Sequence, residues 1–110
     1  MIVYYINSYD ITDMALFSQY PVGIGPLLRK YGAEVLASDT AGIAVEGQGC
    51  MMNAIIQFPS EEAAMACYQD PAYQPLKAIR QQSTTRCTMV LVKAYVRPAD
   101  TAVPAPKVLG

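Results

Sequence analysis

Residues 2–9 are rich in β-branched and aromatic side chains and residues 50–58 are almost continuously apolar, and both patterns are typical of β-strands. The predicted strands are residues 2–9, 33–38, 50–58 and 86–96. After the second strand comes the turn "SDTAG", and residues 43–46 are expected to return as a hairpin arm before the turn "GQG". The pattern therefore predicts one domain over residues 1–96, followed by a Pro/Ala-rich C-terminal arm over residues 97–110.

The first connection between strands has the spacing of a helix. Apolar residues recur at helical intervals over 13–20, with Thr12 or Asp10 as possible caps. The prolines and glycines of "PVGIGP" should then stop or kink the helix, which resumes over about 24–31 and ends at Gly32.

The second connection is predicted to be helical in two pieces. The Ser60 side chain can cap the first piece, and Glu61 and Glu62 lie in its first turn, where carboxylates favour the helix dipole. The second piece is expected over residues 70–82, with a kink or a fresh start near Pro75.

The element order β-α-β-β-α-β predicts an α+β protein with the antiparallel sheet of a ferredoxin-like fold. Strands 2–9, 50–58 and 86–96 are apolar on both alternating faces, so both faces of the sheet should be buried. Because the helices can cover only one face, a second copy of the chain is expected on the other. The predicted architecture is a dimeric α/β barrel, in which two subunits pack sheet to sheet.

The composition is consistent with self-association, and it argues against nucleic acid and membrane as partners. Of the 110 residues, 53% are hydrophobic and 15% are charged, with a net charge of −1. A chain without a concentrated basic field is not expected to bind nucleic acid. It has no stretch of about 18–20 apolar residues for a membrane span, and its first residues do not resemble a signal peptide.

The cysteines and the absent histidine argue against a metal site. Cys50, Cys67 and Cys87 are an odd number at spacings that match no zinc pattern, and the chain has no histidine. We therefore expect no metal and no other cofactor, and free thiols in a cytoplasmic protein.

Polar side chains on two strands are the first candidates for a site. Tyr5, Asn7 and Tyr9 share one face of the first strand, and Asn53 and Gln57 share one face of the third. In a βαββαβ sheet these two strands are neighbours at the centre, so the two polar rows are expected side by side. They would either pair with one another, within the subunit or across a dimer interface, or line a cavity that binds a ligand.

The stretch 68–80 supplies further candidates. Arg80 is interpreted either as a helix C-terminal cation bonded to a carboxylate such as Asp10 or Glu46, or as a clamp for an anionic substrate. Tyr68 and Tyr73 are candidate substrate-binding and proton-donating phenols, against the alternative that they only pack. Asp10 is a turn or cap residue in one interpretation and a general base in the other.

The chain resembles a bacterial family catalogued as domain of unknown function thirteen-thirty, within the dimeric α/β-barrel superfamily. The resemblance covers residues 2–95 and includes an arginine at Arg80. It is carried by "YINSYDITD" at 5–13, Tyr20, "KYGAEVLA" at 30–37, Glu46-Gly47, "IIQFPSEEAA" at 55–64 and "CYQDPAYQPLKAIR" at 67–80.

The resemblance implies the fold and the dimer but no reaction. Relatives in the wider superfamily include cofactor-free monooxygenases, lactone isomerases, polyketide cyclases and stress proteins without catalytic activity. Two hypotheses follow, and the sequence leaves open whether the chain is an enzyme. It is a cofactor-independent enzyme or binder for a small oxygenated or anionic metabolite in a helix–sheet cleft, or a non-catalytic dimeric module whose polar residues are structural.

Overall fold

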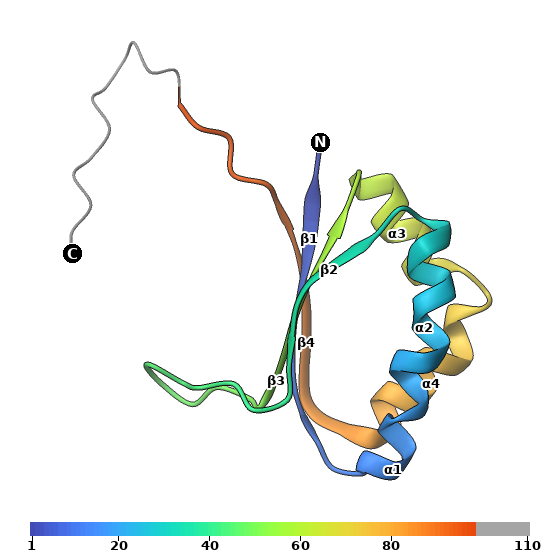
Figure 1. Cartoon of the computed structure of the whole chain (residues 1–110), viewed down its shortest axis with the longest axis vertical. Helices are drawn as coiled ribbons and strands as arrows, with labels where there is room; N and C mark the ends of the chain where they lie inside the picture. Colours follow the sequence, from blue (N-terminus) through green and yellow to red (C-terminus); the bar gives the residue numbers. More distant parts are fainter. Residues whose placement is uncertain (99–110) are drawn as a thin grey trace.

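The helices of the described chain all lie on one face of a four-stranded antiparallel sheet (Figure 1). The computed structural model describes residues 1–98, so most of the predicted arm over 97–110 lies outside the described residues. In chain order the elements are β1 (Val3–Ile11), α1 (Met14–Phe17), α2 (Gln19–Lys30), β2 (Glu34–Asp39), β3 (Met52–Phe58), α3 (Glu61–Gln69), α4 (Tyr73–Ser83) and β4 (Thr84–Lys93). The strands are ordered β2-β3-β1-β4, which confirms the predicted βαββαβ ferredoxin-like fold.

The register of the sheet determines which residues face the helices. Tyr5, Asn7 and Tyr9 of β1 lie opposite Ile56, Ala54 and Met52 of β3. Of these six side chains, five are buried and Ile56 is half-buried, because α2, α3 and α4 cover this face. The alternate residues of each strand lie on the other face, which we call the open face.

The first helical segment breaks at a different place from the one predicted. The Asp13 carboxylate caps α1 by accepting a hydrogen bond from Leu16 N at 3.0 Å, and the chain then restarts at Ser18. Helix α2 runs without interruption through the "PVGIGP" stretch, where a stop or kink was expected. Pro21 is tolerated because it lies in the first turn, where no intrahelical acceptor is needed, and Pro26 lies on the exposed side.

Helices α2 and α4 approach closely at a glycine. A Cβ atom at Gly23 would collide with Leu76 Cδ2 of α4, whereas a Cβ atom at Gly25 would meet only Arg29 Nη1 at 3.6 Å. A larger residue at position 23 would therefore require the Leu76 side chain to shift. The expected helix end is confirmed at Gly32, which has a φ of 69°.

The second helical connection matches its prediction more closely. The Ser60 hydroxyl accepts a hydrogen bond from Ala63 N at 3.1 Å and caps α3, as expected. The last helix starts at Tyr73 rather than at residue 70, after a turn in which Asp70 Oδ1 accepts from Ala72 N. Pro75 lies in the first turn of α4, where its missing N–H needs no acceptor and requires no kink.

Residues 40–51 form a long loop between β2 and β3 that projects from the open-face side of the sheet (Figure 1). The expected hairpin arm at 43–46 is wrong, because no strand forms there. Two apolar residues of this loop are almost fully exposed to solvent, Ile43 at 90% and Val45 at 91%.

Asp70 joins α2 to the turn before α4 and gives the fold an acid-sensitive contact. Its carboxylate accepts from Tyr31 Oη at 2.6 Å, Lys30 Nζ at 2.9 Å and Ala72 N at 2.8 Å. These hydrogen bonds, with that from Tyr31 the largest, lower the pKa of Asp70 from 3.8 to about 2.

The low pKa predicts a loss of stability in acid. Because the folded pKa is depressed, the stabilisation is complete above about pH 4 and is lost as the pH falls toward about 2. We expect Asp70→Asn to be less stable at neutral pH and to lose less stability over this window, as measured by urea unfolding. Asp39→Asn, at an exposed carboxylate, is the matched control and should keep the wild-type dependence. An unchanged pH dependence in Asp70→Asn would contradict this role.

Candidate functional site

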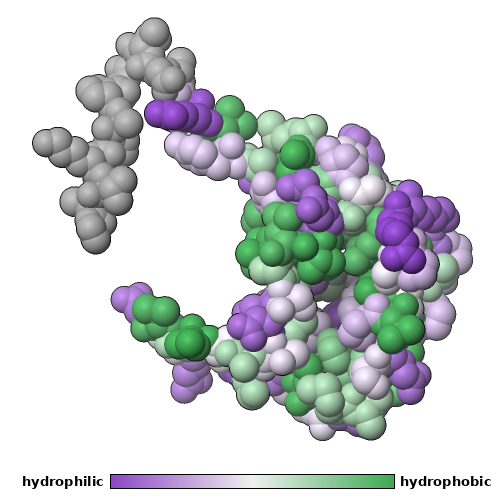
Figure 2. All heavy atoms as spheres, in the orientation of Figure 1, coloured by the Kyte–Doolittle hydropathy of each residue, from purple (hydrophilic) through white to green (hydrophobic). Residues whose placement is uncertain are grey.

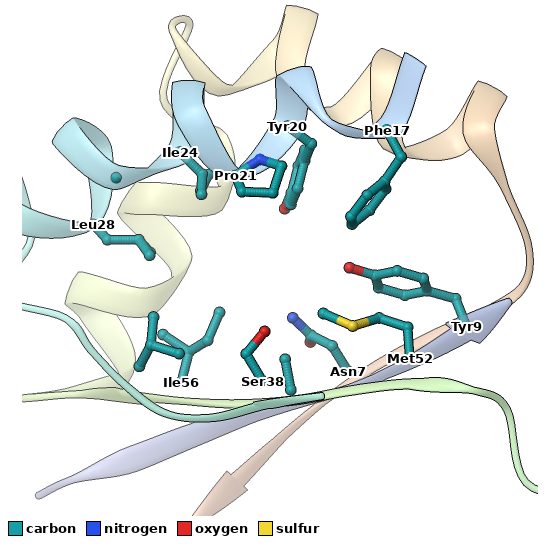
Figure 3. A pocket seen from close by; sticks show the side chains of 13 residues that line it. Asn7, Tyr9, Phe17, Tyr20, Pro21, Ile24, Leu28, Ser38, Met52 and Ile56 are labelled. Carbon is teal, nitrogen blue, oxygen red and sulfur yellow. The ribbon is translucent and has the colours of Figure 1, made fainter. Parts of the chain in front are cut away.

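A cavity of about 190 Å³ lies between α2 and the helix-facing side of the sheet (Figure 3). Its walls are mostly apolar, contributed by α1, α2 and β3: Phe17, Ile24, Leu28, Met52, Ala54 and Ile56. Four polar side chains line it: Asn7, Tyr9, Tyr20 and Ser38. An apolar cavity of about 150 Å³ is large enough to bind benzene, so this one can hold a small ring compound.

Asn7 is one of two residues within 1–98 that have a buried side-chain atom without a hydrogen-bond partner. Its side chain comes from the centre of β1, is only 4% exposed, and points into the cavity (Figure 3). Its Oδ1 atom has no hydrogen-bond partner within residues 1–98. A buried polar atom without a partner costs about 1–3 kcal/mol. The Asn7 amide therefore lowers the free energy of unfolding.

Two tyrosines direct hydroxyl groups into the same cavity. Tyr9 comes from β1 and Tyr20 from α2, and in Figure 3 both hydroxyls point toward the space beside Asn7. Burial raises the pKa of Tyr9 to about 12 and also raises the pKa of Tyr20. Both phenols therefore stay protonated at neutral pH and serve as hydrogen-bond donors.

Behind Tyr20, away from the cavity lining, lies a buried polar cluster. Tyr20 Oη and Tyr73 Oη are 3.1 Å apart, and Tyr73 in turn lies beside the guanidinium of Arg80. Arg80 Nη1 donates to Cys87 Sγ at 2.9 Å, while Arg80 Nε has no partner within residues 1–98. Burial by itself lowers the pKa of Arg80, but Tyr73, Tyr20 and Cys87 outweigh it and the pKa is raised.

The predicted pairing of Arg80 with a carboxylate is wrong. Asp10 instead accepts from Arg86, whose Nη2 and Nε lie 2.7 and 2.9 Å from its Oδ2 atom, and from Met51 N at 2.9 Å. These contacts, with the Met51 N–H the largest, lower the pKa of Asp10. The lowered pKa makes Asp10 a weak base, and it does not line the cavity.

The predicted adjacency of the two polar rows is also wrong. Asn53 lies opposite Ser8 and Gln57 lies opposite Tyr4, so both belong to the open face, whereas Asn7 faces the helices. Asn53 Nδ2 donates to Cys50 O at 2.8 Å at the base of the projecting loop. The physical reason is the register: residues of even number on β1 are opposite residues of odd number on β3, and opposite residues share a face.

The remaining predicted tyrosines lie outside this cavity. Tyr5 Oη donates to Ala64 O at 3.2 Å, and burial raises the pKa of Tyr5 to about 12. Tyr68 packs its ring against that of Tyr73, and Lys77 Nζ lies 4.9 Å from the centre of the Tyr68 ring. Both tyrosines also line a separate hollow of about 230 Å³, together with Met65, Met89 and Leu91.

Several cavity residues had not been singled out from the sequence. Tyr20, Phe17 and Ser38 were not candidates, although the helical spacing of Tyr20 and Phe17 placed them on the same segment. Met52 and Ala54 could have been found from the alternation of buried residues in β3. Ser38 depends on the register shift between Val35 and Ala37, for which the sequence gives no signal.

The open face carries apolar side chains and a second hollow. Ile55, Ile6 and Val90 are opposite one another and form a row across β3, β1 and β4. Figure 2 shows apolar side chains along this side of the sheet and on the projecting loop. The hollow, of about 350 Å³, lies between that loop and the sheet and includes Asn53, Glu46 and Cys50 in its lining.

The part of the chain that the structure describes shows neither a cluster of metal-binding side chains nor a membrane-spanning helix. Within residues 1–98, no group of three or more histidine, cysteine or acidic side chains is placed to hold a metal ion. None of the helices in this range has the length and apolar character needed to cross a bilayer.

The fold and the cavity define a ferredoxin-like α+β protein with a ligand-sized space between its helices and its sheet. The chain belongs to the family described as Domain of unknown function (DUF1330), whose model matches residues 2–95. The family resemblance seen in the sequence is thereby confirmed. No curated protein matches the chain in sequence.

Solved structures share the fold at low sequence identity. A protein of unknown function from Rhodopseudomonas palustris has a TM-score of 0.76 and 16% identity over 88% of this chain and 84% of that chain. SnoaB, a cofactor-independent oxygenase from Streptomyces nogalater, has a TM-score of 0.63 and 12% identity, over 87% and 95%. A dimeric ferredoxin-like protein of unknown function from Thermobifida fusca has a TM-score of 0.62 and 12% identity, over 86% and 92%.

Proposed function

We propose that this protein is a cytoplasmic, cofactor-independent enzyme that acts on a small oxygenated ring compound in the cavity beside Asn7. The observation that carries the proposal is the buried Asn7 amide, whose Nδ2 is directed into a cavity that two phenol hydroxyls also face, and whose Oδ1 has no partner within residues 1–98. A ligand with an oxygen-bearing group would satisfy these polar atoms, while its ring would contact the apolar walls.

The volume of the cavity supports a small substrate that reacts without an organic cofactor. At about 190 Å³ it is below the roughly 300–1,000 Å³ of pockets that hold drug-sized ligands, so it has room for one small molecule. The description of SnoaB as a cofactor-independent oxygenase is compatible with such chemistry on this fold. The cytoplasmic location is supported by Cys50, Cys67 and Cys87, which are all unpaired.

A homodimer is part of the proposal. Its support is the apolar row of the open face, in which Ile6 is 36% and Val90 is 53% exposed, together with the exposed loop residues Ile43 and Val45. The structure from Thermobifida fusca with the same fold is described as dimeric. Two open faces packed together would cover this apolar surface.

The binding experiment compares phenol with benzene, which differ by the hydroxyl group. We expect the wild-type chain to bind phenol about 3–10-fold more tightly than benzene, as one net hydrogen bond of about 0.5–1.5 kcal/mol implies. Asn7→Leu should prefer phenol less than the wild type does, because the Tyr9 and Tyr20 donors remain, and it should be more stable, because it removes an unpaired buried amide. Ser8→Leu, at the adjacent position on the open face, is the control and should keep the preference for phenol. Equal binding of phenol and benzene by the wild-type chain would contradict the proposal.

A non-catalytic binder is the second candidate, and one observation favours it. No carboxylate lines the cavity within residues 1–98, and its two phenols have raised pKa values, so the lining supplies no evident general base. Exchange of the α-protons of cyclohexanone in D₂O separates the candidates. In this exchange a C–H bond breaks, the proton passes to solvent, and a deuteron returns to the same carbon. An enzyme should accelerate it relative to Tyr20→Phe, and a binder should not.

A further inference from the structure

The charge of Arg80 is buried without a carboxylate. Its side chain is 4% exposed, and the ion pairs within residues 1–98 involve other groups, Lys30 with Asp70 and Arg86 with Asp10. A buried cation is stable only when neighbouring groups compensate for its lost hydration. The groups that face it from the surrounding elements are Tyr73 on α4, Tyr20 on α2, Tyr9 on β1 and Cys87 on β4.

These neighbours are arranged in an order that leads to the cavity. Tyr73 is the group that raises the pKa of the buried Arg80 most, its Oη lies 3.1 Å from Tyr20 Oη, and Tyr20 lines the cavity. A guanidinium has donors only, so the lone pairs of Tyr73 Oη turn toward it and the single Tyr73 proton turns away. Either hydroxyl of the pair can be the donor by geometry, and the guanidinium favours donation from Tyr73 to Tyr20 Oη.

The same argument gives the direction in which the Tyr20 hydroxyl donates its proton. Tyr20 Oη accepts from Tyr73, so its own single proton is free to point elsewhere, and Figure 3 shows the hydroxyl directed toward the space beside Asn7. Hydrogen bonds in a chain polarise one another, and here the chain begins at a fixed positive charge. The cavity therefore presents a phenol donor that is strengthened by a cation it does not contact.

We propose that Arg80, acting through Tyr73 and Tyr20, makes the cavity bind a ring compound preferentially as its oxyanion, an enolate or a phenolate. This inference rests on the proposed function and names its substrate class. Arg80 is a positioning residue here, because it does not line the cavity, and Tyr20 is the group that would contact the oxyanion.

The rest of the lining is compatible with a negative charge. The Tyr9 hydroxyl points toward the same space as the Tyr20 hydroxyl and is a second donor. No carboxylate lines the cavity within residues 1–98, so none repels an anion there. The apolar walls by themselves would have the opposite effect, since burial in apolar surroundings favours the neutral form. The sign of the preference therefore distinguishes the polarised donor chain from simple burial.

The test uses 4-nitrophenol, whose neutral and anionic forms differ in absorbance, bound to the full chain. We expect the probe bound to the wild-type protein to titrate at least about one pH unit lower than the free probe, a tenfold preference for the anion. Tyr73→Phe, Tyr20→Phe and Arg80→Met should each move the titration to or above that of the free probe. Arg80→Lys, which keeps the charge, should retain part of the preference.

Controls and outcomes separate this inference from the proposed function. Arg86→Met removes a cation that is paired with Asp10 outside the cavity, and it should leave the titration of the bound probe as in the wild type. If the wild-type protein binds the neutral probe more tightly, or if both tyrosine variants keep the anion preference, the inference is overturned and the cavity remains a binding site. If neither phenol nor 4-nitrophenol binds saturably, the proposed function itself fails. Should Arg80→Met not fold, the two tyrosine variants still decide the question.

Discussion

Ala54→Leu is expected to abolish the binding of phenol while the chain stays folded. Ala54 is buried on β3, 6% exposed, and its side chain forms part of the cavity wall. The leucine adds three carbon atoms, which would occupy space that a small ring needs. Because each buried methylene group contributes about 0.8 kcal/mol, filling an existing space should keep or raise the free energy of unfolding.

Calorimetric titration with phenol and urea unfolding measure the two effects. We expect the affinity of Ala54→Leu for phenol to fall at least tenfold, with an unfolding free energy equal to or above that of the wild type. Ala66→Leu, the same substitution at an exposed position of α3, is the control and should change neither. Where leucine proves too large for the fold, Ala54→Val provides a smaller step in the same direction. Wild-type affinity in a folded Ala54→Leu protein would place the ligand elsewhere.

Ile6→Glu is expected to convert the proposed homodimer into a folded monomer. Ile6 is the central member of the row Ile55–Ile6–Val90 on the open face. In a two-fold dimer the substitution places two carboxylates in the interface, and a buried unpaired charge costs about 3–5 kcal/mol. At about 1.4 kcal/mol per tenfold, the dissociation constant should rise at least a hundredfold.

Light scattering coupled to gel filtration, at several concentrations, measures this shift. Val22→Glu is the matched control, because Val22 is 80% exposed on α2, on the other side of the molecule from the open face, and the dimer should persist. The monomeric variant should retain the far-ultraviolet circular dichroism of the wild type. A wild-type protein that is monomeric at micromolar concentration would contradict the sheet-to-sheet dimer.

The element order could be predicted from the sequence because its signals are local. Apolar strands, the Ser60 cap and Gly32 at a helix end act within a few residues of chain. The continuity of α2 could not be predicted in this way. Gly23 lies against Leu76 of α4, which is distant in the sequence, and tertiary contacts of this kind override local helix propensity.

Only part of the candidate site could be predicted, because strand alternation is local whereas strand register is not. Alternation correctly grouped Asn7 with Tyr9 on one face of β1, and both line the cavity. It could not show which face of β3 matches that face of β1, because the match depends on hydrogen bonding between distant strands, and a shift of one residue reverses it. Asn53 was therefore paired with the wrong neighbours.

Arg80 illustrates a second limit. It was singled out from the sequence as a candidate, and the expected partners were a carboxylate or a substrate. The structure gives it tyrosines and a thiol instead. Such an environment is assembled from α2, α4, β1 and β4, and no local pattern in the sequence encodes it.

The most direct test of the central claim is where a bound ligand lies. Intermolecular nuclear Overhauser effects between the ring protons of phenol and the protein's methyl groups would locate it. A ligand in the cavity between α2 and the sheet should give effects to Ile24, Leu28 and Ile56, which line it. Effects confined to the open-face residues Ile6 and Val90, or no effects at saturating phenol, would contradict the assignment of the cavity beside Asn7 as the functional site.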